Sequence, residues 1–280
     1  MVQNRVDLTI DELKKVGAFV HKHTGVYLED EKLKRFKRKV EDILIKNSID
    51  NFSNFYHKIR FQKDEKLTQE LINAVTINET YFWREYEQFE ILSKEILPKI
   101  VENSTSTPHI RILVLPTSSG EELYSIMISI LEEGSVIERA NIEIIGIDID
   151  SDMIKKAKRG VYTKRSVDKL PKDILERYFR KAGELYQIDS NLIKYANFLH
   201  ANLFDLSLQA KLGSFDIIFS RNMLIYFNEK DKQHSFETFY SLLKPQGVLF
   251  LGHADTNNID KKLFTPLHYG FHTFKKLPKY

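Results

Sequence analysis

The sequence predicts an α/β protein in which a Rossmann-like domain follows an all-α N-terminal domain. Over residues 1–75, apolar residues recur at the spacing of amphipathic helices. From Ile110 onward, short apolar runs alternate with helical segments, which is typical of a parallel sheet with helices on both faces. An irregular stretch over 160–198 interrupts this alternation. We therefore expect a helical domain at 1–75 and an α/β domain at 76–280, with a small antiparallel β subdomain inserted at 160–198.

The composition is that of a soluble globular protein, with 42% apolar and 29% charged residues. No apolar run approaches the roughly 18 residues that cross a bilayer, so membrane insertion is not expected. The absence of cysteine excludes disulfides and fits a cytoplasmic location. A net charge of +3 indicates no overall nucleic-acid-binding surface. No His and acidic residues show metal-ligand spacing, so no metal site is predicted.

The N-terminal helices are marked by caps and apolar periodicity. Thr9 and Glu12 have the spacing of a capping box, and Gly25 is a residue type that ends helices. Asp50 is placed to cap a third helix, and apolar residues over 67–75 predict a fourth. The second predicted helix carries a run of basic residues on one face. Such a run is usually a solvated face, or it steers an acidic partner toward the protein. That basic face comprises Lys32, Lys34, Arg35, Lys37, Arg38 and Lys39.

In the α/β domain, apolar runs of β type are expected to form strands. A helix is predicted over 86–100, and another begins at Glu121. Within the insert, Leu185–Ile188 and the run 192–195 flank the turn residues 189–191, which predicts a β-hairpin. The strands of the main sheet are expected at 110–115, 142–147, 197–202, 215–219 and 248–251.

The loop after the first strand, residues 116–122, has the composition of a cofactor site. Gly120 permits close backbone approach, and the following helix offers free N–H groups. One glycine does not make the three-glycine cradle of a dinucleotide. Glu121 and Glu122 would repel a phosphate and attract a cation, so a ligand with an amino or sulfonium group fits better. S-adenosylmethionine carries both groups; the alternative for this loop alone is an ordinary capped turn.

Polar residues at the ends of two further strands suit a nucleoside. Asp148 ends the second predicted strand, where an acid accepts hydrogen bonds from ribose hydroxyls in nucleoside-binding folds. Asp150 is the alternative acceptor, but it also has the place of a helix N-cap. Asn202 can hydrogen-bond an adenine edge with Leu203 as an apolar face, although an Asn here is alternatively a turn former.

Two segments are candidates for the reaction site. Residues 76–84 combine an amide, hydroxyls, aromatic rings and an arginine, so they can stack on a flat ligand while Arg84 grips a carboxylate. The loop 220–227 has the topological position of a substrate-facing loop, where Tyr226 or Phe227 would line the transfer site. The alternative is that both are ordinary core aromatics, and His253 is interpreted as a structural histidine.

Together these segments resemble the CheR-type chemotaxis-receptor glutamate methyltransferases along almost the full chain. Each match is short, but nine of them occur in the family's order with compatible spacing. The matching residues are Asn78-Glu79-Thr80-x-x-x-Arg84, Ser119-Gly120-Glu121-Glu122-x-Tyr124-Ser125, Asp148-Ile149-Asp150, Gly160-x-Tyr162, Arg177-Tyr178-Phe179, Asn202-Leu203, Arg221-Asn222-x-x-Ile225-Tyr226-Phe227, Leu243-Lys244-Pro245-x-Gly247 and Gly252-His253.

The resemblance implies methyl transfer from S-adenosylmethionine to glutamate side chains of chemotaxis receptors, with S-adenosylhomocysteine as product. Glutamate is already ionised at neutral pH, so no general base is required and Glu79 has no such role. Arg84 and Tyr226 would lie near the methyl group, with Arg84 holding either the substrate or the cofactor carboxylate, and Trp83 would serve packing. The residues expected around the cofactor are Asn78, Thr80, Arg84, Ser119, Gly120, Glu122, Asp148, Asn202, Leu203, Ser220, Arg221 and Asn222.

The expected partners are methyl-accepting chemotaxis receptors, whose methylated regions are helical and rich in glutamate. Lys34, Arg35 and Arg38 are expected to contact them, and no nucleic acid is expected. The insert is compact, so docking of a receptor's C-terminal peptide is not expected. Pro116 stands where the family has a small residue, which bears on cofactor affinity. Two alternatives remain: a non-catalytic module of the same fold, and a nucleic-acid methyltransferase with a steep salt dependence.

Overall fold

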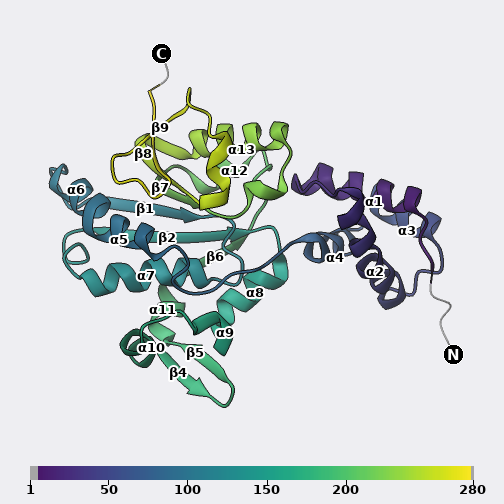
Figure 1. Ribbon diagram of the computed structural model, residues 1–280, viewed down its shortest axis with the longest axis horizontal. Coiled ribbons are helices and arrows are strands. Elements are labelled where there is room, and N and C mark those ends of the chain that lie inside the picture. The colour runs from purple at the N-terminus through teal and green to yellow at the C-terminus, as the bar shows by residue number, and fades with distance from the viewer. Residues whose placement is uncertain (1–5, 279–280) are drawn as a thin grey trace.

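The computed structural model describes residues 6–278 of the 280-residue chain. Figure 1 shows a helical N-terminal domain at one end and an α/β domain around a central sheet at the other. A small β subdomain projects from the α/β domain. A linker, residues 76–85, crosses from α4 (Glu65–Val75) of the helical domain to α5 (Tyr86–Ile91) of the α/β domain.

The first helix, α1 (Ile10–Thr24), has the predicted caps. Thr9 and Glu12 form the capping box, each side chain satisfying a backbone N–H of the other residue. Gly25 ends the helix with a φ of 73°, a left-handed conformation that glycine adopts without steric cost. Both predictions are confirmed.

The remaining helices of this domain pack their apolar faces into one core. They are α2 (Asp30–Lys46), α3 (Phe52–Arg60) and α4. The predicted cap of α3 at Asp50 is wrong by one residue, because the side chain of Asn51 accepts from the N–H of Asn54 at 2.9 Å. A short polar side chain at either position suits a cap, so composition alone does not separate the two.

The central sheet has seven strands in the order β6-β2-β1-β7-β8-β10-β9. The first five strands are parallel, while β10 pairs antiparallel with both β8 and β9. All five predicted strands are present, and the sequence pattern does not predict the antiparallel pair. The strands are β1 (His109–Val114), β2 (Asn141–Asp148), β6 (Asn197–His200), β7 (Phe215–Ser220), β8 (Leu243–Leu251), β9 (Phe264–Pro266) and β10 (Thr273–Lys276).

Helices cover both faces of this sheet. Successive residues of β1 point to opposite sides, so Ile112 belongs to one apolar core and Leu113 to the other. The helix predicted over 86–100 is present, with a π-helical turn at Leu92–Ile96. One core lies under α5, α6 (Leu97–Glu102), α7 (Glu121–Glu133) and α8 (Ser151–Arg159), and the other under α12 (Leu208–Leu212) and α13 (Glu229–Leu242).

The β insert differs from the predicted hairpin. Its strands β3 (Val161–Thr163), β5 (Leu185–Ile188) and β4 (Phe179–Ala182) lie side by side in that order. The hairpin is formed by β4 and β5, with Gly183 in the turn at a φ of 63°. The predicted second arm is instead the helix α11 (Ser190–Tyr195), because the Asp189 side chain caps it by accepting from the N–H of Asn191. Two short helices, α9 (Lys164–Val167) and α10 (Lys172–Tyr178), complete the insert.

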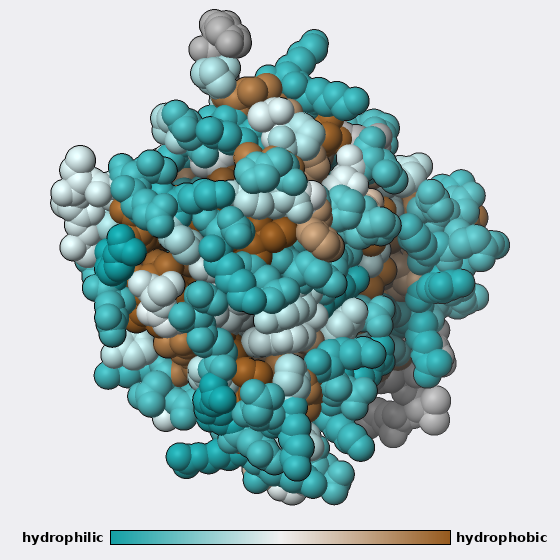
Figure 2. All heavy atoms as spheres, turned by 60° about the vertical axis from the view of Figure 1, so that its left-hand side comes forward, coloured by the Kyte–Doolittle hydropathy of each residue, from teal (hydrophilic) through white to brown (hydrophobic). Residues whose placement is uncertain are grey.

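The surface is largely polar. Figure 2 shows hydrophilic side chains over most of one face, with apolar atoms scattered between them. Within residues 6–278, no helix is both long enough and apolar enough to cross a membrane.

Candidate active site

A cleft opens at the carboxyl ends of the parallel strands, where the strand order changes direction at β1. It contains about 1030 Å³, part of which is open to solvent. Segments that directly follow β1, β2, β6 and β7 contribute to its walls. Open α/β sheets bind their ligands at this position, so the cleft is the candidate active site.

The helical domain closes one side of the cleft. Thr24 at the end of α1 and Val26 just beyond it are part of the lining. Val26 pairs with Phe227 in an isolated antiparallel bridge, and the N–H of Tyr27 donates to the carbonyl of Tyr226 at 3.0 Å. Both domains therefore build the cleft, although the sequence pattern assigns no part of it to residues before 76.

Glu122 and Arg221 form an ion pair in the wall of the cleft. Arg221 Nε donates to Glu122 Oε2 at 2.9 Å, and only 1% of the Arg221 side chain is exposed. The guanidinium lies 5.0 Å from the ring centroid of Phe89, and Nη1 contacts Oε1 of Gln88 at 3.3 Å. Burial raises the pKa of Glu122, and the charge of Arg221 opposes that shift. These contacts fix both side chains before any ligand binds.

Three buried polar atoms of the lining have no hydrogen-bond partner within residues 6–278. They are Thr117 Oγ1, Ser118 Oγ and Glu122 Oε1, all on or next to the loop between β1 and α7. A buried polar atom without a partner costs about 1–3 kcal/mol, so native proteins usually satisfy it with water or a ligand. This loop therefore fits a ligand that brings hydrogen-bond donors.

Asp148 ends β2 in the cleft, and its carboxylate is tied to neighbouring backbone. Oδ2 accepts from the N–H of Ser118 at 2.7 Å, and Oδ1 accepts from the N–H of Asp150 at 2.8 Å. Burial raises the pKa of Asp148 to about 6, although the two N–H groups favour the carboxylate. Each carboxylate oxygen accepts more than one hydrogen bond, so capacity remains for the hydroxyls of a ligand.

Asp150, the alternative acceptor, is fully used by the protein. Oδ1 caps α8 by accepting from the N–H groups of Asp152 and Met153, which confirms the predicted cap. Oδ2 accepts from Oγ1 of Thr76 at 2.6 Å and from Nδ2 of Asn78 at 2.8 Å. The carboxylate thus fastens the linker to the loop after β2. Asn78 lines the cleft, but its amide N–H is already directed to Asp150.

Arg84 and Tyr226 line the same cavity from separate segments. Nη1 of Arg84 donates to the carbonyl of Glu79 at 2.9 Å, and the guanidinium lies 5.6 Å from the ring centroid of Tyr81. The Glu79 carboxylate forms an ion pair with Arg165 at 2.7 Å. Burial raises the pKa of Tyr226. The geometry brings the two predicted reaction-site residues together; their part in the reaction stays a prediction.

Asp255 anchors the loop that follows β7. Its Oδ2 accepts from the N–H of Asn222, and its Oδ1 accepts from the N–H of Ile225 at 3.2 Å. Burial raises the pKa of Asp255 to about 6, and the backbone N–H groups of this loop oppose the shift. Asp255 belongs to η3 (His253–Asn258), a separate segment, so no local sequence pattern singles it out.

Most residues expected around the cofactor line the cleft, but Ser119, Gly120 and Ser220 do not. The Ser119 hydroxyl bonds within its own loop, and a Cβ on Gly120 would lie 3.0 Å from both Ala157 and Phe198. These positions support the lining from behind. The expected residues that line the cleft are Asn78, Thr80, Arg84, Glu122, Asp148, Asn202, Leu203, Arg221, Asn222 and Tyr226.

The side chain of Asn202 has partners within the protein. Nδ2 donates to the carbonyl of His23 at 2.7 Å, and Oδ1 accepts from the N–H of Phe204 at 2.9 Å. The preceding strand, β6, ends two residues earlier than predicted, at His200. These contacts favour the alternative turn role of Asn202, which here also joins the α/β domain to α1.

Other predicted residues lie outside the cleft or serve packing. The Trp83 ring stacks on Tyr86 with centroids 5.3 Å apart, which agrees with a packing role. His253 Nδ1 lies 2.9 Å from His272 Nε2. Lys34, Arg35 and Arg38 are exposed on α2, and none of them is part of the lining. Among the residues described, no group of three or more His, Asp or Glu side chains could hold a metal ion.

Two family models match the chain in adjacent segments. The model described as "CheR methyltransferase, all-alpha domain" matches residues 11–76, and "CheR methyltransferase, SAM binding domain" matches residues 78–269. The chain belongs to the CheR methyltransferase family. The second match covers most of the residues that line the cleft, so S-adenosylmethionine is the cofactor of this domain, and the predicted family and Rossmann-like fold are confirmed.

Curated relatives of the CheR family align along most of the chain. Chemotaxis protein methyltransferase 2 of Vibrio cholerae is 36% identical over 262 residues, which cover 93% of this chain and 91% of that protein. The chemotaxis protein methyltransferase of Campylobacter jejuni (strain 81-176) is 35% identical and covers 91% and 93% respectively. That of Borreliella burgdorferi is 30% identical and covers 92% of each. The chain is accordingly an S-adenosylmethionine-dependent methyltransferase.

The residues of the cleft fit this cofactor. S-adenosylmethionine brings an ammonium group and ribose hydroxyls as donors, a carboxylate, and a positive sulfonium. The unsatisfied oxygens of Ser118 and Glu122 require donors, and Asp148 has capacity for hydroxyls. Arg84 and Arg221 offer guanidinium groups to a carboxylate. Pro116 lies in the lining beside these groups.

Proposed function

We propose that this CheR-family enzyme transfers the methyl group of S-adenosylmethionine to glutamate side-chain carboxylates of chemotaxis receptors in the cytoplasm. One observation carries the proposal: the acidic and unsatisfied groups around Glu122 and Asp148 share a single cleft with Arg84 and Tyr226. Relatives named chemotaxis protein methyltransferases, each aligned over more than nine-tenths of the chain, support the same substrate class.

Within the cleft, each group has a proposed contact. Asp148 accepts from the ribose hydroxyls, and Glu122 accepts from the ammonium group through Oε1, which has no hydrogen-bond partner among the described residues. Arg221 is held by Glu122 and Phe89 and presents its remaining N–H groups to the cofactor carboxylate. Leu203 offers an apolar surface to the adenine. The bound cofactor supplies an electrophilic methyl group.

The reaction requires little acid–base chemistry from the protein. A glutamate side chain has a pKa of about 4.3, so the attacking carboxylate is ionised at neutral pH. The enzyme instead aligns the carboxylate oxygen with the methyl group and the sulfur, and such positioning can lower the activation barrier by roughly 7–11 kcal/mol. Arg84 and Tyr226 are proposed to orient the substrate carboxylate toward the methyl group. Arg84 is half-buried and donates to the Glu79 carbonyl, which holds the guanidinium in place to orient the carboxylate.

The basic face of α2 is proposed to guide the receptor toward the cleft. Lys34, Arg35 and Arg38 are exposed, and the receptor helices that carry methylation sites are acidic. Opposite charges accelerate the encounter of two proteins, fix their orientation and disfavour wrong partners. Docking of a receptor's C-terminal peptide on the insert forms no part of the proposal.

One assay tests the proposal against its alternatives. Labelled S-adenosylmethionine is incubated with the protein and receptor-containing membranes, and the products are treated with mild base. Carboxyl methyl esters release volatile methanol, whereas methylated amines and nucleic acids do not. Base-labile label in the receptor supports the proposal. Label in RNA or DNA would show a nucleic-acid methyltransferase, and failure to bind S-adenosylhomocysteine in calorimetry would show a non-catalytic module.

A further inference from the structure

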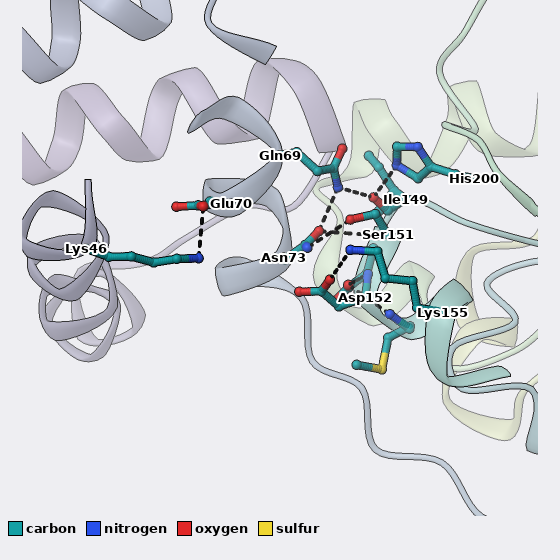
Figure 3. Close-up of polar contacts among 11 residues, drawn as sticks. Lys46, Gln69, Glu70, Asn73, Ile149, Ser151, Asp152, Lys155 and His200 are labelled. Carbon is teal, nitrogen blue, oxygen red and sulfur yellow. Dashed lines mark hydrogen bonds and ion pairs between the residues drawn. The ribbon is translucent and has the colours of Figure 1, made fainter. Parts of the chain in front are cut away.

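The helix α4 of the N-terminal domain holds the loop that follows β2 through two amide side chains. In Figure 3, Gln69 and Asn73 lie one turn apart and point toward Ile149 of that loop and Ser151 at the start of α8. Gln69 Nε2 donates to the carbonyl of Ile149 at 2.9 Å, and Asn73 Nδ2 donates to Oγ of Ser151 at 3.1 Å. The N–H of Ser151 donates back to Oδ1 of Asn73 at 3.3 Å. The contact therefore acts on the loop's backbone as well as on a side chain.

The two amides are themselves ordered. Gln69 Nε2 also donates to Oδ1 of Asn73 at 2.6 Å, so each side chain restricts the other. His200, at the end of β6, places its Nε2 3.0 Å from the same Ile149 carbonyl. Gln69, Asn73 and Ser151 are all half-buried, which limits competition from water.

This contact lies directly behind the cofactor cleft. Asp148 and Ile149 form one part of the lining, and Val75 and Thr76, at the end of α4 and just beyond it, form another. Thr76 is also bonded to Asp150, the residue between Ile149 and Ser151. The amides of α4 thus fix the separation between two walls of the cleft, one from each domain.

We propose that Gln69 and Asn73 are positioning residues for S-adenosylmethionine, which hold the backbone around Ile149 so that Asp148 meets the ribose. The inference rests on the proposed function, because it takes the cleft as the cofactor site. Neither residue touches the cofactor; both act through the Ile149–Ser151 segment. The helical domain then contributes to cofactor affinity as well as to receptor contact.

The same helix provides a matched control. Glu70, next to Gln69 in sequence, accepts from Nζ of Lys46 at 2.9 Å and from Nδ2 of Asn47 at 2.7 Å. These bonds stay inside the helical domain, and Figure 3 shows Glu70 directed to Lys46 and away from the loop. The variant Glu70→Gln therefore weakens a comparable number of hydrogen bonds made by α4, but it leaves the contacts with the Ile149–Ser151 segment intact.

The test measures binding of S-adenosylhomocysteine by calorimetry to the full-length protein. Asn73→Ala is expected to weaken binding about fivefold, because it removes hydrogen bonds that each contribute modestly in water. Ser151→Ala is expected to have a smaller effect, since its N–H remains. The double variant should bind no more weakly than Asn73→Ala alone, because both substitutions remove the same contact. Glu70→Gln should match the wild type.

Steady-state kinetics separate positioning from general damage. In Asn73→Ala the KM for S-adenosylmethionine should rise by a similar factor, while kcat at saturating cofactor and the KM for receptor stay unchanged. Wild-type affinity in Asn73→Ala would overturn the inference, and so would equal weakening in Glu70→Gln, which would indicate a general loss of stability. If the wild type itself fails to bind, the proposed function falls and this inference falls with it.

Discussion

Glu122 and Arg221 form a buried ion pair although they follow different strands of the sheet. Arg221 comes directly after β7, and Glu122 lies at the start of α7, beyond the loop that follows β1. The two strands are parallel neighbours, with Val114 opposite Phe219, so their carboxyl ends bring the two loops together. The 2.9 Å contact places one carboxylate and one guanidinium in the cleft wall, where opposite ends of an amino acid can be held.

Removing the arginine of this pair should destabilise the protein. Arg221→Met leaves the Glu122 carboxylate buried without its counter-charge, so the free energy of unfolding should fall by about 3 kcal/mol near neutral pH. Urea denaturation measures this change. The double variant Arg221→Met/Glu122→Gln should recover part of the loss, because the buried Glu122 charge is removed as well, although Glu85 still lacks its contact with Arg221 at 3.9 Å. Equal stability of the single variant and the wild type would contradict the buried pair.

Asp148 should make S-adenosylhomocysteine binding depend on pH. Burial raises the pKa of its carboxyl to about 6, and donation from ribose hydroxyls would favour the ionised form. Binding should therefore release protons near pH 6, and affinity should rise as the pH increases through that value. Calorimetry in buffers of different ionisation enthalpy measures the proton release. Asp148→Asn should abolish it, and unchanged release in that variant would assign the titration to another group.

The same raised pKa has a consequence for the free protein. The folded value lies above that of about 4 expected in the unfolded chain, so the free energy of unfolding falls as the pH rises from about 4 to about 6, and this loss persists at higher pH. This cost is absent below about pH 4, where the group is protonated in both states. Cofactor binding should therefore raise the unfolding temperature more at neutral pH than at acid pH, which thermal unfolding with and without S-adenosylhomocysteine tests.

Asp255 is expected to control the rate through the loop it anchors. Asp255→Asn replaces one acceptor oxygen by an amide NH₂ group that faces a backbone N–H, so the Asn222–Tyr226 region should shift. We expect kcat to fall at least about tenfold, because small misplacements at a reaction site are costly. Asp260→Asn is the control, since Asp260 also accepts from a backbone N–H but lies away from the cleft. Equal activity of the two variants would remove this role from Asp255.

Charge reversal on α2 should affect the receptor and not the cofactor. The triple variant Lys34→Glu/Arg35→Glu/Arg38→Glu should methylate the receptor more slowly and with less dependence on salt, because steering by the basic face is lost. S-adenosylhomocysteine binding should stay at the wild-type level, since none of the three lines the cleft. The variant Lys261→Glu/Lys262→Glu is the control, because it also replaces exposed positive charges by negative ones. Unchanged methylation at low ionic strength in the α2 variant would contradict the docking role.

The strands that position the cleft could be predicted because they are buried on both faces. The segments that became β1, β2, β7 and β8 each contain a short continuous apolar run bounded by turn residues. Strands β9 and β10 could not be predicted in this way, because they are short and carry polar residues and a proline. They pair at the sheet end beyond β8 and do not form part of the cleft.

The error in the β insert has a local cause. Residues 192–195 contain two apolar residues and a tyrosine, a pattern that fits a strand or a short helix equally well. Asp189 suits a turn and a helix N-cap for the same reason, because its carboxylate accepts from backbone N–H groups two residues on. The Asp189 side chain caps a helix at these residues, and the hairpin turn lies at Gly183 instead.

Contacts between the two domains place residues in the cleft that sequence patterns could not predict. Thr24 and Val26 line it only because α1 docks on the loop around Tyr226. Asn202 was identified by its place after a strand, but its partner, the carbonyl of His23, lies 179 residues away in sequence. Such long-range pairings leave no periodic signal, whereas Asp148 ends β2 and Arg221 follows β7, at the positions where open α/β sheets bind ligands.

The central claim is that receptor glutamates receive the methyl group in the cleft that holds Arg84. Mass spectrometry of receptor peptides, after incubation with the enzyme and S-adenosylmethionine, locates the transferred group. We expect the mass of one methyl group on glutamate side chains of the receptor's helical cytoplasmic region, labile to mild base and absent with a folded Arg84→Ala variant. Methylation of amines or nucleic acid, or full glutamate methylation by Arg84→Ala, would contradict this account.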